Sequence, residues 1–78
     1  MEIDSKNMEA WKNKGIAFDM LKKYKEAIRC FDKVLEIDPN CVDTWNNKGI
    51  TLRKLKRYNK AIRCYDKVLN IDSKCMNA

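Results

Sequence analysis

The chain has 78 residues, a formal net charge of +6 and no histidine. At this length it forms one small domain, which buries only about 60% of the surface that the unfolded chain exposes. It has no apolar run of the roughly 18–20 residues that span a bilayer and no N-terminal apolar block with a cleavage site, so we expect a cytoplasmic protein without a membrane segment.

The first half of the chain predicts two amphipathic helices. Apolar residues recur at spacings of three or four over residues 8–21, and again over residues 27–37, which is the spacing of one helical face. Lys22-Lys23-Tyr24 is predicted to form the turn between them. Asp38-Pro39-Asn40 should end the second helix, because the residue before a proline avoids helical backbone angles.

The second half repeats the first. Residues 42–75 laid over residues 8–41 give 19 identities in 34 positions without a gap. The copy predicts a third helix carrying Trp45 and Gly49, a turn near Lys56-Arg57, a fourth helix with an apolar stripe over residues 61–69, and a terminator at Asp72-Ser73-Lys74. A fixed period of this length predicts a repeat array, in which each unit buries its apolar face by stacking on a neighbour.

One glycine recurs inside the first helix of each half, as Gly15 and Gly49. Because glycine in a helix interior costs roughly 1 kcal/mol relative to alanine, its repetition predicts a close contact between helices, with Ala27 and Ala61 facing the two glycines. The aromatic side chains are interpreted as packing residues and not as a ligand cage.

Four cysteines occupy two positions of the repeat: Cys30, Cys41, Cys64 and Cys75. Equivalent positions of stacked units lie about two helix layers apart, each layer roughly 8–10 Å thick, which is too far for a disulfide. With no Cys-x-x-Cys pair and no histidine, a zinc site is not predicted either. We interpret the cysteines as reduced thiols of a cytosolic protein, and we expect no metal and no cofactor.

These residues resemble the tetratricopeptide repeat family, whose helix-turn-helix unit of 34 residues carries Trp, Gly, Tyr, Ala, Phe and Pro at set positions. Residues 8–41, the first unit, match it with Trp11, Gly15, Phe18, Ala27, Phe31 and Pro39, and residues 42–75, the second unit, with Trp45, Gly49, Leu52, Ala61 and Tyr65. Lys14 and Lys48 stand where the family has Leu, and we expect their ammonium groups to reach solvent. The resemblance implies an all-α fold of four helices stacked as a right-handed α-solenoid.

The resemblance extends to both ends of the chain. Residues 1–7 resemble the tail of a preceding unit, and residues 76–78 resemble the start of a truncated third unit. Solenoids usually end in a polar-faced capping element, and none follows residue 75. We therefore expect the last helix to expose part of its apolar face, and self-association through that face is one alternative for the behaviour of the chain.

The usual role of the family implies a non-catalytic module that holds a protein, peptide or partner helix in a concave groove lined by the first helices. By register, the groove residues are Lys12, Asn13, Ile16, Asn46, Asn47, Ile50, Arg53 and Lys54. Lys12 and Asn47 match a clamp that one subfamily uses for C-terminal carboxylates, but Ile16 departs from it and the third unit of that clamp is missing.

Positive charge concentrates in the second unit, which carries a net +6 against +1 in the first. Six basic residues crowd residues 53–63: Arg53, Lys54, Lys56, Arg57, Lys60 and Arg63. Such a patch favours an acidic protein partner or, as an alternative, a nucleic-acid backbone; a Lys-rich surface that serves only solubility is the third interpretation. Catalysis is not predicted, because the chain has no histidine, no Gly-rich phosphate loop and no nucleophile beside a candidate base.

Overall fold

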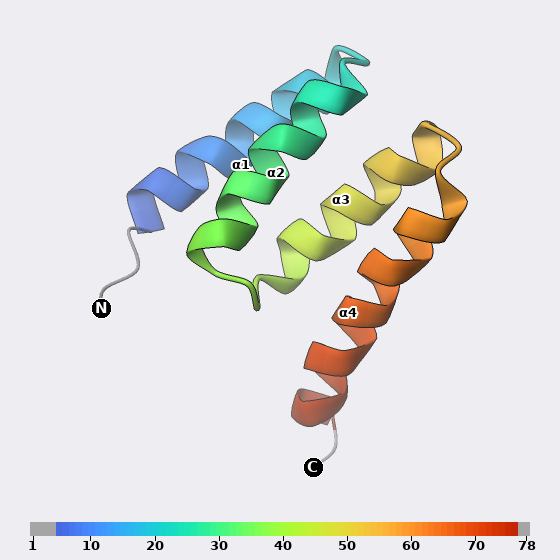
Figure 1. The fold of residues 1–78 in the computed structure, drawn as a ribbon. Coiled ribbons are helices and arrows are strands. Elements are labelled where there is room, and N and C mark those ends of the chain that lie inside the picture. The colour runs from blue at the N-terminus through green and yellow to red at the C-terminus, as the bar shows by residue number, and fades with distance from the viewer. Residues whose placement is uncertain (1–4, 77–78) are drawn as a thin grey trace.

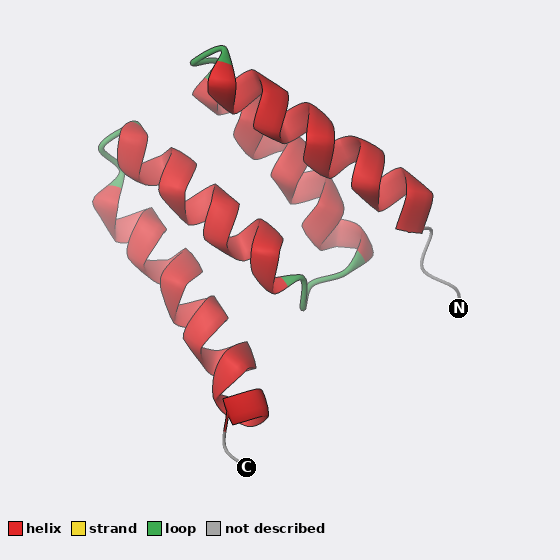
Figure 2. Cartoon of the chain, turned by 180° about the vertical axis from the view of Figure 1, so that it is seen from behind, coloured by secondary structure: helices red, strands yellow, loops and turns green. Residues whose placement is uncertain are grey.

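Four helices make up the computed structural model, which describes the backbone of residues 5–76 and the side chains of residues 7–71. They are α1 (Ser5–Met20), α2 (Tyr24–Ile37), α3 (Val42–Lys54) and α4 (Tyr58–Met76). The helices pair as two hairpins, α1 with α2 and α3 with α4, and α3 packs against α2 to join them. Helices α2 and α4 lie on one face (Figure 1), and α1 and α3 lie on the opposite face (Figure 2). The prediction of an all-α fold of helix-turn-helix repeats is therefore confirmed for the described part of the chain.

Both hairpins turn through a lysine in the left-handed backbone region. Lys22 has φ 64° and Lys56 has φ 63°. The backbone N–H of each lysine donates to the carbonyl three residues earlier, and the next N–H donates to the carbonyl five residues before it, at 2.8–2.9 Å. This is the Schellman arrangement that closes a helix C-terminus, and it normally carries glycine. The predicted turns at both places are confirmed.

The connection between the hairpins is closed by local hydrogen bonds. Asp38 adopts extended backbone angles, as expected before a proline, and its carboxylate accepts a hydrogen bond from the backbone N–H of Asn40 at 3.1 Å. The indole Nε1–H of Trp45 donates to the carbonyl of Pro39 at 2.6 Å. The first turn of α3 is thus tied to the loop that precedes it, and the predicted stop at Asp38-Pro39-Asn40 is confirmed.

The two outer helices are longer than predicted. α1 begins at Ser5, whereas the apolar pattern placed its start at Met8. α4 continues to Met76, so the predicted terminator at Asp72-Ser73-Lys74 is wrong. Ser73 keeps the backbone N–H that Pro39 lacks and brings no ring to clash with the preceding turn, so the helix has no reason to stop there. Residues 1–4 and 77–78, to which part of the predicted end segments belongs, lie outside the described residues.

Each helical glycine lies closest to an aromatic ring of the paired helix. A Cβ added to Gly15 would lie 2.6 Å from Cε1 of Phe31, and one added to Gly49 would lie 2.7 Å from Cε1 of Tyr65. The ring lies one helical turn beyond Ala27 or Ala61, so the glycine makes room for it. The prediction of a close helix contact is confirmed, and the nearest group is the ring; the predicted place of Ala27 and Ala61 opposite the glycines stays a prediction.

The core follows the apolar stripes of the second helix in each unit. In α2 the buried side chains include Phe31 and Val34, both 0% exposed. In the second unit Leu52, Ala61 and Cys64 form a buried cluster, against which Ile28, Trp45 and Tyr65 pack. Ile28 belongs to the first unit, so this cluster joins the two units. None of the described helices is both long and apolar enough to cross a membrane.

Candidate functional site

A hollow of about 640 Å³ lies between α2 and α4, with α3 at its base. Among the described residues, no Cα atom of α2 comes within 8 Å of one in α4, while α3 contacts both helices. The hollow is lined by Lys25, Ile28, Arg29, Asp32, Trp45, Lys48, Leu52, Leu55, Arg57, Lys60, Arg63, Cys64 and Lys67. We call it the basic hollow, because seven of these side chains are cationic and one is a carboxylate.

The floor of the basic hollow is apolar and part of the packed core. Leu52 is 4% exposed and Cys64 is 3% exposed. Ile28 and Trp45 are half-buried and pack against them. Because its indole N–H is held by Pro39, Trp45 presents its ring to the hollow from a fixed position. Such a floor suits an apolar side chain of a ligand, since ligand sites are lined mainly by apolar and aromatic groups with a few charged ones.

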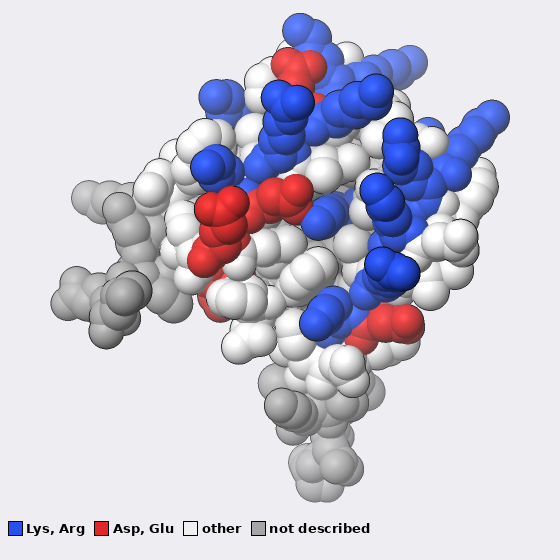
Figure 3. All heavy atoms as spheres, in the orientation of Figure 1, with Lys and Arg blue, Asp and Glu red and all other residues white. Residues whose placement is uncertain are grey.

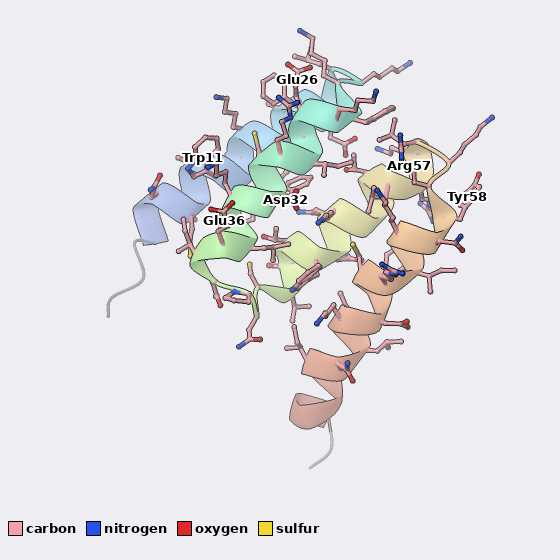
Figure 4. The ribbon with its side chains drawn as sticks, viewed as in Figure 1. Trp11, Glu26, Asp32, Glu36, Arg57 and Tyr58 are labelled. Carbon is pink, nitrogen blue, oxygen red and sulfur yellow. The ribbon has the colours of Figure 1, made fainter. Side chains whose placement is uncertain are left out.

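The rim of the hollow carries the positive charge. Figure 3 shows Lys and Arg gathering over α4 and over the start of α2 on this face. Lys48 of α3 is neutralised by Asp32 of α2, whose Oδ1 lies 2.6 Å from its Nζ; Figure 4 labels Asp32 beside α3. The ammonium group of Lys67 lies 5.9 Å from the centre of the Trp45 ring. Among the described side chains, no ion pair joins the other six cations to a carboxylate: Lys25, Arg29, Arg57, Lys60, Arg63 and Lys67.

The thiol of Cys64 at the floor is held in its neutral form. Burial raises its pKa, and the nearby Lys48 only partly offsets this effect. The equivalent Cys30 in the first unit is buried in the same way, and burial raises its pKa too. A thiol is nucleophilic as the thiolate, so the hollow offers no activated sulfur. Cys30, Cys41 and Cys64 are free thiols, as the sequence predicted, and the side chain of Cys75 lies outside the described ones.

The structure divides the predicted basic patch into separate parts. Arg57, Lys60 and Arg63 line the basic hollow together. Lys54 instead turns to α1, where its Nζ lies 3.3 Å from Oδ1 of Asp19. Lys56 occupies the left-handed turn before α4, and Arg53 lines no part of the hollow. Lys56 lies with Arg57 and Lys60 at a second hollow at the start of α4. Four of the six residues therefore adjoin one another, whereas Arg53 and Lys54 line neither hollow.

The predicted groove residues lie on the other helices. Lys12, Asn13 and Ile16 belong to α1, and Asn46, Asn47, Ile50, Arg53 and Lys54 belong to α3; all eight are exposed or half-buried. None of them lines the basic hollow. Lys54 is the one member that joins the two helices directly, through its ion pair with Asp19. This face, formed by α1 and α3, remains a prediction as a binding site.

Several residues of the hollow were missed by the sequence analysis. Lys25 and Arg29 are spaced by four residues on α2, and Lys60, Arg63 and Lys67 by three and four on α4. These spacings place each set on one helical face, and this signal was present in the sequence. No such signal was present for Lys48. Its ammonium group was expected to reach solvent, but it pairs with Asp32 of the preceding unit.

Two stacked helical hairpins with equivalent turns, glycine contacts and cores define a helical-repeat protein, a class that works by presenting a surface to partners. A family model for the tetratricopeptide repeat matches residues 9–41 and again residues 42–75. The chain belongs to the tetratricopeptide repeat family, whose repeats generally mediate protein–protein interaction. A search among curated proteins found no match to the chain.

Proposed function

We propose that this chain is a non-catalytic binding module that holds an acidic segment of a partner protein in the basic hollow. The observation that carries the proposal is the combination of an apolar floor, which contains Trp45 and Leu52, and a rim of six cations that pair with no carboxylate of the described side chains. A peptide with carboxylates on both sides of an apolar side chain fits this arrangement. Protein binding in general is what the family does; the acidic partner and its location are the proposed part.

The charges favour a peptide over a small anion. The cations are spread along α4 from Arg57 to Lys67 and across to Lys25 and Arg29 on α2. All of these side chains are exposed, and an exposed ion pair contributes only about 0.2–1 kcal/mol. Useful affinity therefore needs several carboxylates acting together with burial of an apolar anchor on the floor.

The test is a fluorescence-anisotropy titration with a short labelled peptide in which Glu alternates with Leu, compared with its Gln-for-Glu counterpart. The double variant Arg63→Gln/Lys67→Gln removes two charges from the hollow. The matched control, Lys12→Gln/Arg53→Gln, removes two charges of the same kinds from the predicted groove face. We expect the first to weaken binding by about 3- to 10-fold, from two lost exposed pairs, and the control to bind like the parent chain.

Two outcomes would contradict the site. If the control loses binding and the hollow variant does not, the peptide binds on the face of α1 and α3, as the groove residues predict; Asn47→Ala should then weaken it as well. If both variants lose affinity equally, net charge and not a site determines binding.

Nucleic acid is the alternative ligand for the same cations. Binding to a single strand would weaken steeply with salt, with a slope proportional to the number of phosphates neutralised, and would be largely independent of sequence. The observation against it is the floor, because Trp45 is half-buried and fixed by Pro39, and Tyr58 of α4, although exposed, does not line the hollow. A labelled oligothymidylate in the same titration separates the two: tighter binding than the acidic peptide would favour nucleic acid.

The cytosol is the compartment that we propose for the chain. Its three described cysteines are unpaired, and proteins of reducing compartments keep their thiols in this state. Fractionation of cells that express the tagged protein tests this location directly.

A further inference from the structure

The contact between the two units provides a template for a contact between two molecules. In this contact Lys48 of α3 pairs with Asp32 of α2, and Ile28 of α2 packs against the core cluster of the second unit. Thr44 and Thr51 lie on the helical face of Lys48, at spacings of four and three residues, and are 0% exposed; Leu35 lies on the face of Asp32 and is only 9% exposed. The interface is therefore apolar at its centre and carries one ion pair.

Helix α4 carries the same contact residues that α2 uses to pack against α3. By the 34-residue repeat, Ile62, Asp66 and Leu69 of α4 correspond to Ile28, Asp32 and Leu35 of α2. Ile62 is 54% exposed and Leu69 is 66% exposed. Asp66 is exposed, and among the described side chains no ion pair engages it.

Helix α1 carries residues at the positions that α3 uses to pack against α2. Lys14 corresponds to Lys48, and Ala10 and Ala17 correspond to the fully buried Thr44 and Thr51. All three α1 residues are exposed, and Leu21, the first residue after the helix, is 65% exposed. The ammonium group of Lys14 lies over the rings of Trp11 and Phe18 of its own helix, and no described carboxylate pairs with it.

We infer that a second copy of this chain docks its α1 against α4 of the first, in the register of the contact between α3 and α2. In this arrangement Lys14 of one copy pairs with Asp66 of the other, and Leu69 and Ile62 become covered. The two surfaces differ from each other, so the contact is head-to-tail and propagates into open stacks instead of closing as a dimer.

Charge and shape together favour a second copy as the occupant. A partner helix for α4 needs a cation opposite Asp66 and a small side chain one turn to either side of that cation. Helix α1 supplies both, with the same spacing between the cation and the small residues as in α3. The match is looser than the internal one, because Ala10 and Ala17 fill less space than Thr44 and Thr51. We therefore expect weaker association than within the chain, which appears only as the protein concentration rises. The inference uses neither the basic hollow nor its ligand.

The test is light scattering after size-exclusion chromatography over a concentration series, with the thiols kept reduced. We expect the mean mass of the parent chain to rise continuously with concentration. Leu69→Gln should raise the dissociation constant by about tenfold or more, as for a leucine removed from a buried contact. Because Leu69 is mostly exposed in the single chain, the far-ultraviolet circular dichroism and the thermal midpoint of the Leu69→Gln variant should equal those of the parent chain.

Charge reversal then tests the register. Asp66→Lys and Lys14→Glu should each suppress association, and the double variant, or a mixture of the two single variants, should restore it. Glu36→Lys and Lys33→Glu, two exposed positions of α2, are the matched controls and should leave it unchanged. A chain that stays monomeric at all concentrations, a species that stops at a dimer, or association that ignores both Leu69→Gln and the charge reversals would overturn the inference.

Discussion

Replacement of Gly15 by alanine tests the close contact at the centre of the first hairpin. The added Cβ would lie 2.6 Å from Cε1 and 2.9 Å from Cδ1 of Phe31, which is inside the distance at which carbon atoms repel. Phe31 is 0% exposed, so its ring has no free space to enter. Overpacking of this kind costs about 1–3 kcal/mol, and alanine regains roughly 1 kcal/mol of helix propensity. The difference lies between about 0 and 2 kcal/mol, and because the ring cannot move away we expect a net loss of about 1 kcal/mol of unfolding free energy.

The equivalent Gly49→Ala is the internal comparison. Its Cβ would lie 2.7 Å from Cε1 of Tyr65, but Tyr65 is half-buried and can shift outward, so we expect a loss of at most about 1 kcal/mol. Urea unfolding followed by circular dichroism measures both variants. Phe31→Leu, combined with Gly15→Ala, should be less destabilising than the sum of the single changes, because the shorter side chain relieves the clash. A Gly15→Ala variant as stable as the parent chain would refute the reasoning.

Two further predictions concern the turns and the thiols. Lys56→Gly should stabilise the chain by about 0.5 kcal/mol, because the relief of left-handed backbone strain exceeds the cost of a more flexible unfolded state. Lys22→Gly should have the same effect. A lower free energy of unfolding in urea for either variant would contradict the Schellman assignment. Cys30 and Cys64 should react with iodoacetamide much more slowly than Cys41, since burial both shields them and raises their pKa. The contribution of these two neutral thiols to the free energy of unfolding should be constant below the ordinary pKa of a thiol. It should be lost as the pH rises through their raised pKa values. Equal labelling of all three cysteines would contradict the burial.

Much of the fold could be predicted from the sequence because the repeat states each local signal twice. Apolar spacing gave the helices, and Pro39 gave the end of α2. The ends of α1 and α4 were less predictable, since Ser73 permits a helix that Pro39 forbids. The left-handed Lys22 and Lys56 could not be predicted either, because glycine is the usual signal for that backbone region.

The basic hollow was predicted less well than the fold. The sequence analysis grouped cations by their distance along the chain, whereas the hollow groups them by helical face. It therefore did not include Lys67 and Arg29, and it grouped Lys54, which pairs with Asp19 of α1, with Arg57. The hollow also depends on the separation of α2 from α4, which follows from how α3 packs between them and which no local pattern reports. The partner of Lys48 is likewise a property of this packing.

The most direct test of the proposed function is a titration of the acidic peptide followed by nitrogen–proton correlation spectra, because the chain has two tryptophans on different surfaces. Trp45 lines the basic hollow. Trp11, which lies on α1 (Figure 4), does not line it. We predict that the indole N–H signal of Trp45 and the backbone signals of Ile28 and Leu52 shift with peptide concentration, while the indole signal of Trp11 stays in place. Shifts confined to Trp11 and to residues of α1 would contradict the basic hollow as the binding site.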